Sequence, residues 1–301
     1  MSDYLSHLEQ KSPNIEAPSG KNASTENFPV ASILISAKNR PIIAAFYAFA
    51  RMADDIADHP TITSEEKVRR LNLLEKTILT KIDQGGCEAA LNLVWMGAGY
   101  NFNEQHALDL LAAFKQDATK TRYSDWGDLI AYCNLSAAPV GRFLLDIHGE
   151  QQENYQFSDA LCNALQIINH LQDCRDDYEK LNRVYLPIDM RIKNGFSIKN
   201  LLNDQDGKAF RLLLDECLVK LNPLMDIASE LPLSLKSKRL ALESAVIVKL
   251  AKLLVSRLQY QDSRITPVKL SKIKAIIGSL EAITSFGIKL IIKIVKYNVA
   301  K

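Results

Sequence analysis

Polar residues recur at helical spacing in an apolar stretch near the start of this 301-residue chain. Five positions between residues 47 and 58 follow the spacing i, i+4, i+7, i+8 and i+11: Tyr47, Arg51, Asp54, Asp55 and Asp58. Residues three and four apart share one face of an α-helix, so these side chains are predicted to form a single stripe, the first acidic stripe. Because apolar residues fill most other positions, we expect this helix to be largely buried in protein.

A second stretch shows the same pattern. Its polar positions follow the spacing i, i+3, i+7 and i+11 and define the second acidic stripe: Gln166, Asn169, Asp173 and Asp177. Asp176 lies beside this stripe, and Pro187 is expected to mark the end of the helix.

Two helix faces rich in carboxylate and amide oxygens predict a site for a hard cation. Unpaired buried carboxylates are costly, so a cation is expected to compensate their charge. Oxygen ligands suit Mg²⁺, which keeps several waters and shares its shell with substrate phosphates. A magnesium-bridged diphosphate is therefore the expected ligand, and Arg51 could pair with the same oxygens.

The residues allow one other interpretation of these stripes and exclude another. Each stripe could be a solvated helix face, although two matching stripes in apolar sequence favour a binding site. A di-iron bundle would need two Glu-x-x-His pairs. None of the five histidines has a glutamate three residues before it, which excludes the di-iron site.

Helical signals dominate the chain, whereas strand signals are nearly absent. Glycine (12) and proline (10) are scarce, and period-two alternation between turn residues is essentially missing. Pro41 can open a helix, and Thr63 with Glu66 matches a capping box. We therefore predict an all-α, single-domain helical bundle. Its predicted organisation has three parts: a disordered arm at 1–25, an all-α domain at 26–282 and a basic amphipathic helix at 283–301.

Cysteine usage and the N-terminal residues favour a cytoplasmic protein. The five cysteines are scattered and never spaced as Cys-x-x-Cys, which argues against a zinc ribbon or a disulfide scaffold. The N-terminal residues are polar and lack the apolar core of a secretion signal. The net charge of +2 is unremarkable, and no nucleic-acid partner is expected.

The C-terminal residues carry a separate charge pattern. Residues 264–301 hold eight basic residues and one acid, for a net charge of +7. Lys289, Lys293 and Lys296 recur at i, i+4 and i+7 among aliphatic residues, which is typical of a helix that lies in a membrane surface. This predicts peripheral association with the inner face of the plasma membrane, while a helix docked on the bundle is the alternative. The apolar sequence is too interrupted to span a bilayer.

Three motifs resemble those of the squalene/phytoene synthase family of head-to-head prenyl synthases. The two acidic stripes resemble the two aspartate-rich motifs of that family, and residues 132–141 resemble its central helix. The resemblance covers roughly residues 25–265 in order and spacing. Within the family it points to the bacterial hydroxysqualene synthase branch of hopanoid biosynthesis through five segments: 26–32, 49–58, 119–123, 136–142 and 169–173.

Two departures from the squalene and phytoene synthase pattern support that branch. Gln172 stands where those enzymes usually carry arginine, and Glu26-Asn27-Phe28 replaces their Lys-Ser-Phe. Both changes remove a donor to phosphate. An enzyme that takes one already-joined diphosphate would not need a second diphosphate pocket.

The resemblance implies an isoprenoid-synthase-type bundle with a central apolar cavity. It further implies Mg²⁺-dependent ionisation of presqualene diphosphate, opening of its cyclopropane and capture of the cation by water to give hydroxysqualene. NADPH, the hydride donor of squalene synthases, is not expected. A presqualene diphosphate synthase could hand over the substrate.

The same resemblance assigns roles to residues of both stripes. Five residues would hold magnesium ions around the diphosphate: Asp54, Asp58, Asn169, Asp173 and Asp177. The four aspartates in this set are the expected catalytic residues. Five residues would bind the substrate: Tyr47, Arg51, Tyr132, Gln166 and Asn169. Arg142 and Tyr185 could reach phosphate or take part in helix-end contacts, and His170 is expected to be a packed histidine.

Two alternatives stay open for the function. A sibling synthase would condense two farnesyl diphosphates head to head to presqualene diphosphate, squalene or dehydrosqualene. A protein of the same fold could instead be an assembly factor for respiratory complex I. Loss of the aspartates would favour that second alternative, and both acidic stripes are intact.

Overall fold

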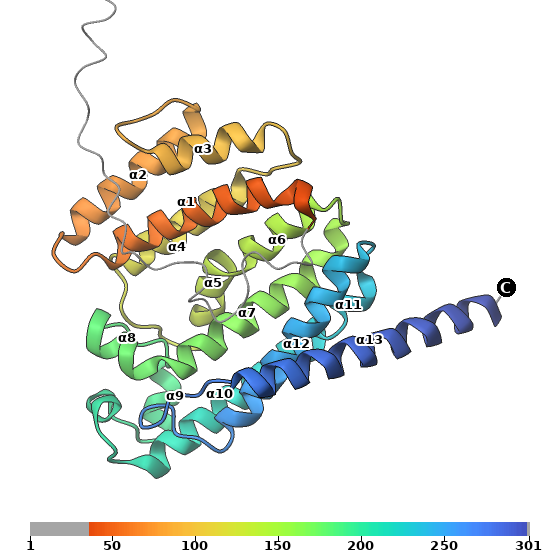
Figure 1. Cartoon of the computed structure of the whole chain (residues 1–301). Coiled ribbons are helices and arrows are strands. Elements are labelled where there is room, and N and C mark those ends of the chain that lie inside the picture. The colour runs from red at the N-terminus through yellow and green to blue at the C-terminus, as the bar shows by residue number, and fades with distance from the viewer. Residues whose placement is uncertain (1–35, 300–301) are drawn as a thin grey trace, which may run out of the picture. The chain divides into compact units, whose positions relative to one another are not determined.

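A computed structural model of the chain describes residues 36–299, and these residues are almost entirely helical (Figure 1). The predicted arm at 1–25 and the segment Glu26–Phe28 lie outside the described residues. Within the described range there is no β-strand, only an isolated bridge between Arg122 and Val184. The all-α fold class is therefore confirmed. Contacts divide the chain into two units, residues up to Thr119 and residues from Lys120 onward.

The first unit is built around a buried helix. After a short 3₁₀ turn, Ala37–Asn39, its described residues form four helices: α1 (Arg40–Asp58), α2 (Ser64–Thr80), α3 (Glu88–Gly97) and α4 (Gln105–Asp117). Helix α1 contacts each of the other three. Pro41 lies in its first turn, and Thr63 caps α2 by accepting a hydrogen bond from the Glu66 amide at 3.3 Å, as the sequence predicted.

The second unit contains nine helices among the described residues. They are α5 (Trp126–Ser136), α6 (Ala138–Ile147), α7 (Tyr155–Gln172), α8 (Cys174–Leu181), α9 (Ile188–Lys193), α10 (Gly207–Ala228), α11 (Leu231–Ser234), α12 (Lys238–Leu258) and α13 (Lys272–Val299). Two 3₁₀ segments, Gln152–Asn154 and Ile198–Leu202, connect them. Helix α7 lies at the centre of this unit and contacts α5, α6, α10 and α12. The residues that precede Asp173 are thus carried by the best-packed helix of the unit.

A buried arginine anchors the loop between α12 and α13, residues 259–271. The Arg264 side chain is fully buried and pairs with Asp262 at 2.6 Å. Its guanidinium also donates to the backbone carbonyls of Asn200 and Gln205, and it lies 4.3 Å from the ring centroid of Phe210. Because a buried charge is tolerated only when its donors are satisfied, these contacts hold the loop in one position.

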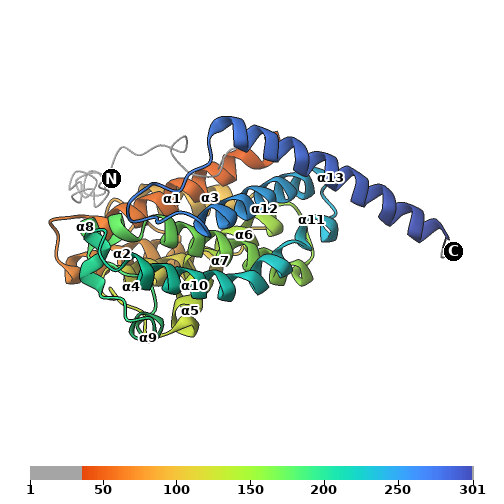
Figure 2. The same cartoon turned by 90° about the horizontal axis from the view of Figure 1, so that it is seen from below.

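Helix α13 packs on α12 through one face and exposes the other. Gly278, Ala282, Phe286 and Leu290 recur every four residues and face the bundle. A Cβ added at Gly278 would lie 2.7 Å from Leu253 Cδ1, so glycine allows the two helices to approach closely. Both views show α13 lying along α12 (Figures 1 and 2).

The outer face of α13 is a row of exposed aliphatic side chains. It comprises Ile273, Ile277, Leu280, Ile288, Ile291 and Val295. The segment Lys272–Lys293 has a mean hydropathy of 1.7 and is long and apolar enough to cross a membrane, yet only 11% of it is buried. The helix predicted for 283–301 thus starts earlier, at Lys272, and carries more apolar surface than the sequence interpretation allowed. Residues 300–301 lie outside the described range.

The cysteines are inaccessible. Four are buried and Cys162 is partly buried, and none of the described residues forms a disulfide. Burial raises the pKa of the thiols of Cys133, Cys162 and Cys174 to about 12. At neutral pH these three thiols are therefore protonated and are poor nucleophiles.

Candidate active site

The first acidic stripe lies on α1, where one guanidinium bridges two carboxylates. Arg51 Nη1 lies 2.9 Å from Asp54 Oδ2, and Arg51 Nη2 lies 2.7 Å from Asp55 Oδ1. The Asp55 side chain is 5% exposed and that of Asp54 is 32% exposed. Asp55 therefore points toward protein and Asp54 toward the open side of the stripe. Arg51 thus compensates part of the negative charge of this stripe.

The open side of this stripe carries excess negative charge. Burial and the neighbouring charge of Asp58 raise the pKa of Asp54 to about 7, against the opposing effect of Arg51. Asp117, at the end of α4, contributes to the same rise. Sequence reasoning missed Asp117, because only the packing of α4 on α1 brings it near the stripe. A group of carboxylates that repel one another in this way is a favourable site for a divalent cation.

The second acidic stripe does not lie on one continuous helix, and that prediction is wrong. Helix α7 ends at Gln172 and α8 begins at Cys174, with Asp173 at the junction. The backbone nevertheless keeps helical hydrogen bonds there, from the Asp173 amide to the Asn169 carbonyl at 2.9 Å and from the Asp177 amide to the Asp173 carbonyl at 2.8 Å. Successive stripe residues therefore stay near one another along the helix surface.

The end of this segment also differs from the prediction. Helix α8 ends at Leu181, where Asn182 adopts a left-handed conformation with φ of 51°. Pro187 instead precedes α9 as its N-terminal cap residue. Asparagine tolerates the left-handed region better than most residues. Helix α8 therefore ends just before Asn182, and not at Pro187 as predicted.

An imidazole connects the two halves of the second stripe. His170 Nδ1 lies 3.8 Å from Asp177 Oδ2, and His170 Nε2 lies 3.2 Å from Gln166 Nε2. The His170 ring stacks on that of Tyr185, with centroids 3.5 Å apart. His170 is packed, as predicted, but it contacts two residues of the stripe and so positions them.

Aromatic side chains surround this histidine. Tyr132 is buried, and its ring centroid lies 5.5 Å from that of Tyr185 and 6.0 Å from that of His170. Tyr123 completes the cluster at 5.2 Å from Tyr132 and 5.4 Å from Tyr185. The family resemblance assigned Tyr132 to substrate binding, and the structure places it in a cluster of rings next to the second stripe.

Three further predicted positions have defined surroundings. Burial and the charge of Asp177 raise the pKa of Asp173, while Lys269 acts in the opposite direction. Tyr47 lies on α1 one turn before Arg51 and is partly buried. Arg142 pairs with Asp159 at 2.6 Å, which supports the salt-bridge interpretation of this arginine.

Gln172 takes part in the packing of the chain. Its side chain is buried, and its amide Nε2 donates to the backbone carbonyl of Val268 in the loop before α13. Arg175 on α8 donates to the Arg264 carbonyl of the same loop at 3.1 Å. This loop therefore braces the α7–α8 junction that carries Asp173.

The donor chemistry of both stripes fits magnesium. Among residues 36–299, no three His, Cys, Asp or Glu side chains are grouped as a complete metal-binding set. Magnesium does not require such a set, because one or two carboxylates with water and substrate phosphates suffice. Burial, followed by the charges of neighbouring aspartates, raises the pKa values of Asp54 and Asp173.

Comparison with known proteins identifies the family. A family model of squalene/phytoene synthases matches residues 21–274. The chain belongs to the squalene/phytoene synthase family. This match confirms the family that the sequence motifs indicated and covers both acidic stripes.

Relatives in the squalene/phytoene synthase family align with this chain over most of their own length. A hydroxysqualene synthase from Rhodopseudomonas palustris is 43% identical over 270 residues, which cover 90% of this chain and 92% of that protein. A hydroxysqualene synthase from Sinorhizobium fredii is 40% identical, covering 86% of this chain and 88% of that protein. The crystal structure of squalene synthase HpnC from Alicyclobacillus acidocaldarius has a TM-score of 0.69 and 27% identity, covering 81% and 92% of the respective chains. The similarity therefore extends to the predicted hydroxysqualene synthase branch.

Proposed function

We propose that the protein is a hydroxysqualene synthase that acts on presqualene diphosphate. The observation that carries this proposal is the 43% identity to the Rhodopseudomonas palustris enzyme over nearly the whole of both chains. Both acidic stripes are intact within that span. The reaction breaks the carbon–oxygen bond to diphosphate and opens the cyclopropane. Water then adds to the cation, and a proton is released.

Five residues of the two stripes are proposed to hold magnesium around the diphosphate: Asp54, Asp58, Asn169, Asp173 and Asp177. Bound magnesium would supply Lewis-acid stabilisation of the departing diphosphate. Arg51 would orient Asp54 and present a guanidinium to phosphate oxygens. Tyr47 and Gln166 would bind the same group, and His170 would position Gln166 and Asp177. These roles are supported by the raised pKa values of Asp54 and Asp173.

The ring cluster of Tyr132, Tyr123 and Tyr185 is proposed to face the hydrocarbon part of the substrate. Aromatic faces stabilise nearby cations, and the reaction generates carbocations that must survive until water arrives. The centroid spacings of 5.2 to 5.5 Å show that the three rings form one contiguous cluster beside the second stripe. NADPH is not part of this proposal, because water rather than hydride ends the reaction.

Helix α13 is proposed to rest on the inner face of the plasma membrane. Its outer face exposes a row of isoleucines, and its inner face packs on α12 through Ala282 and Phe286. Lys249 pairs with Glu281 at 2.7 Å, and Lys293 donates to the Leu233 carbonyl at 2.7 Å. These contacts support a helix that lies on the membrane surface while it stays docked, and not one that leaves the unit to span the bilayer. A membrane position would also suit hand-over of an amphiphilic C₃₀ diphosphate from a presqualene diphosphate synthase.

Product analysis tests the catalytic proposal. Purified protein is incubated with presqualene diphosphate and Mg²⁺ without NADPH, and the products are identified by mass spectrometry. A C₃₀ alcohol that disappears when EDTA is added would support the proposal. Unchanged substrate would contradict it, and conversion of farnesyl diphosphate instead would favour head-to-head condensation.

A further inference from the structure

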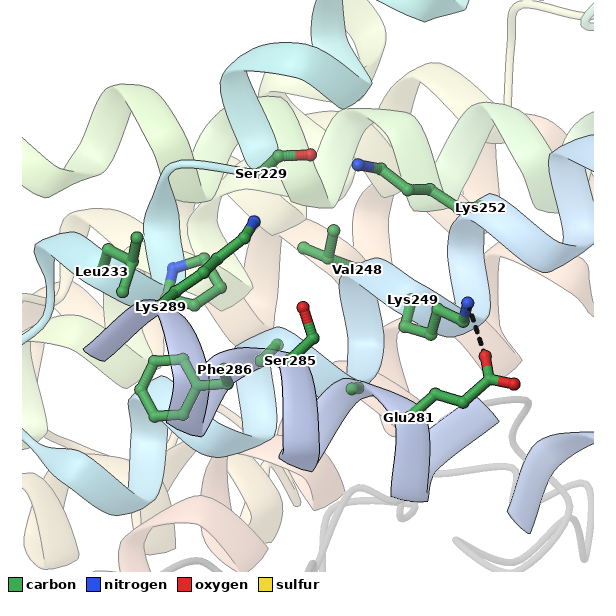
Figure 3. A pocket seen from close by; sticks show the side chains of 12 residues that line it. Ser229, Leu233, Val248, Lys249, Lys252, Glu281, Ser285, Phe286 and Lys289 are labelled. Atoms are coloured by element: carbon green, nitrogen blue, oxygen red, sulfur yellow. Dashed lines mark ion pairs between the residues drawn. The ribbon is translucent and has the colours of Figure 1, made fainter. Parts of the chain in front are cut away.

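A cavity of about 250 Å³ opens between α12 and α13, close to α11 (Figure 3). Val248 and Phe286 form an apolar part of its wall. In the close-up, the amines of Lys252 and Lys289 and the hydroxyls of two serines surround Val248. A cavity with an apolar wall and a few polar groups around it is typical of a small-molecule site.

The charge around this cavity favours an anion. Three lysines line it, Lys249, Lys252 and Lys289, together with one acid, Glu281. Glu281 pairs with Lys249 at 2.7 Å. Among the described residues, no carboxylate lies within 4.0 Å of the amine of Lys252 or Lys289. Two ammonium groups beside an apolar wall are therefore available to an anionic group, and ammonium groups bind phosphate as point charges.

A second hollow, of about 640 Å³, continues the first on the outer side of α13. The two hollows share Glu281, Ser285 and Lys289. The outer hollow is otherwise lined mainly by aliphatic side chains of the exposed row, including Ile277 and Ile288. A basic cavity thus runs into an apolar groove on the same helix. A basic cavity followed by an apolar groove is complementary to a ligand with an anionic head and a hydrocarbon chain.

We propose that these two hollows form a binding site for one anionic membrane lipid. The lipid phosphate would lie between Lys252 and Lys289, and an acyl chain would follow the outer groove over Ile277 and Ile288. This lipid site depends on the proposed contact of α13 with the membrane. It would make that contact selective for anionic leaflets. The pairing of the two surfaces decides for a lipid over a peptide or a second copy of the chain, because two ammonium groups lie beside a groove lined by Ile277, Leu280 and Ile288, and a lipid joins an anionic head to a hydrocarbon chain.

Vesicle binding by the full chain tests this site. Flotation is measured with phosphatidylcholine vesicles with and without phosphatidylglycerol, for the wild type, Lys252→Gln/Lys289→Gln and the control Lys208→Gln/Lys220→Gln. The control removes two exposed charges from α10 and matches the change in net charge. Each cavity lysine should contribute roughly fivefold to binding of anionic vesicles, so the cavity variant should lose about 25-fold. The control should stay within about twofold, because screening weakens distant charges.

Native mass spectrometry of the full chain with a short-chain phosphatidylglycerol measures the stoichiometry. One bound lipid that is lost in the cavity variant would support the site, and inorganic phosphate should not displace it. Equal losses in both double variants would overturn the proposal, as would equal binding to neutral and anionic vesicles. A dimer formed through α13 in place of lipid binding would overturn it too.

The same variants separate this site from the proposed reaction. Turnover of presqualene diphosphate in vesicle-free buffer should be unchanged in Lys252→Gln/Lys289→Gln, because neither lysine belongs to the acidic stripes. If the wild type bound one lipid but showed no turnover, the proposed reaction would fail and the lipid site would stand. If turnover were normal and lipid binding absent, the lipid site alone would fail.

Discussion

The imidazole of His170 lies against the phenol ring of Tyr185, with ring centroids 3.5 Å apart and planes inclined by 13°. This stack fixes the orientation of a ring whose nitrogens face Gln166 and Asp177. Gln166 on α7 and Asp177 on α8 thus lie beside the same imidazole, although the two helices are separate.

Replacing His170 by alanine should reduce turnover by about 10- to 100-fold, the usual cost of losing a group that orients a metal ligand. His170→Phe preserves stacking on Tyr185 but removes both ring nitrogens. Steady-state kinetics with a Mg²⁺ titration measures the effect. If the nitrogens position Asp177, both variants should require more Mg²⁺. A His170→Phe variant with wild-type behaviour would reduce the role of His170 to packing.

Asp54→Asn should lower turnover by orders of magnitude while the helical circular dichroism stays unchanged, because the variant removes a proposed magnesium ligand without changing side-chain volume. Asp109→Asn, which removes a carboxylate elsewhere in the first unit, serves as the control. Near-normal turnover in Asp54→Asn would remove this residue from the metal role.

Asp54 should make the free energy of unfolding depend on pH. Its carboxyl ionises near 3.8 ordinarily, whereas its pKa in the folded protein is about 7. The folded state therefore binds more protons than the unfolded state between these values, and the free energy of unfolding falls as pH rises through that window. Thermal unfolding in EDTA should show a falling Tm from about pH 4 to about pH 7. Asp54→Asn should flatten this slope, whereas an unchanged slope would assign it to other groups.

Magnesium should counter the fall in Tm that is expected as the pH rises. Its ligands must be deprotonated, and bound metal relieves the repulsion between the carboxylates. The rise in Tm on adding Mg²⁺ should be larger above pH 7 than near pH 5. Na⁺ at the same ionic strength serves as the control for unspecific screening.

Gln172→Ala should destabilise the protein by about 1–3 kcal/mol, because it leaves the buried carbonyl of Val268 without its donor. Urea unfolding followed by circular dichroism measures the change, and the exposed Gln152→Ala provides the control. A stability loss no larger than that of the control would show that this hydrogen bond contributes little. The departure from the arginine pattern at this position thus has a structural consequence as well as the predicted loss of a phosphate donor.

Local spacing predicted the first stripe because every determinant of α1 lies within the helix itself. Pro41 opens it, and residues at i, i+3 and i+4 share its face. The different burial of Asp54 and Asp55 could not be predicted, because the packing of α1 against its neighbours decides which carboxylate points inward.

The break at Asp173 could not be predicted either, for a long-range reason. Gln172 and Val268 are 96 residues apart, and Arg175 and Arg264, which form the other contact that braces this junction, are 89 residues apart. Sequence spacing contains no information on such contacts. The early start of α13 did leave a local signal, since the Ser271 hydroxyl accepts from the Lys274 amide at 3.3 Å, as a cap residue does.

Four of the five cysteines are buried, and burial raises the thiol pKa of Cys133, Cys162 and Cys174 to about 12, so these three thiols should react slowly with maleimide reagents. A cysteine introduced at an exposed site therefore becomes a selective attachment point without removal of the natural ones. A polarity-sensitive fluorophore attached through Ile291→Cys, which lies outside the lining of the proposed lipid groove, would report whether α13 enters a bilayer.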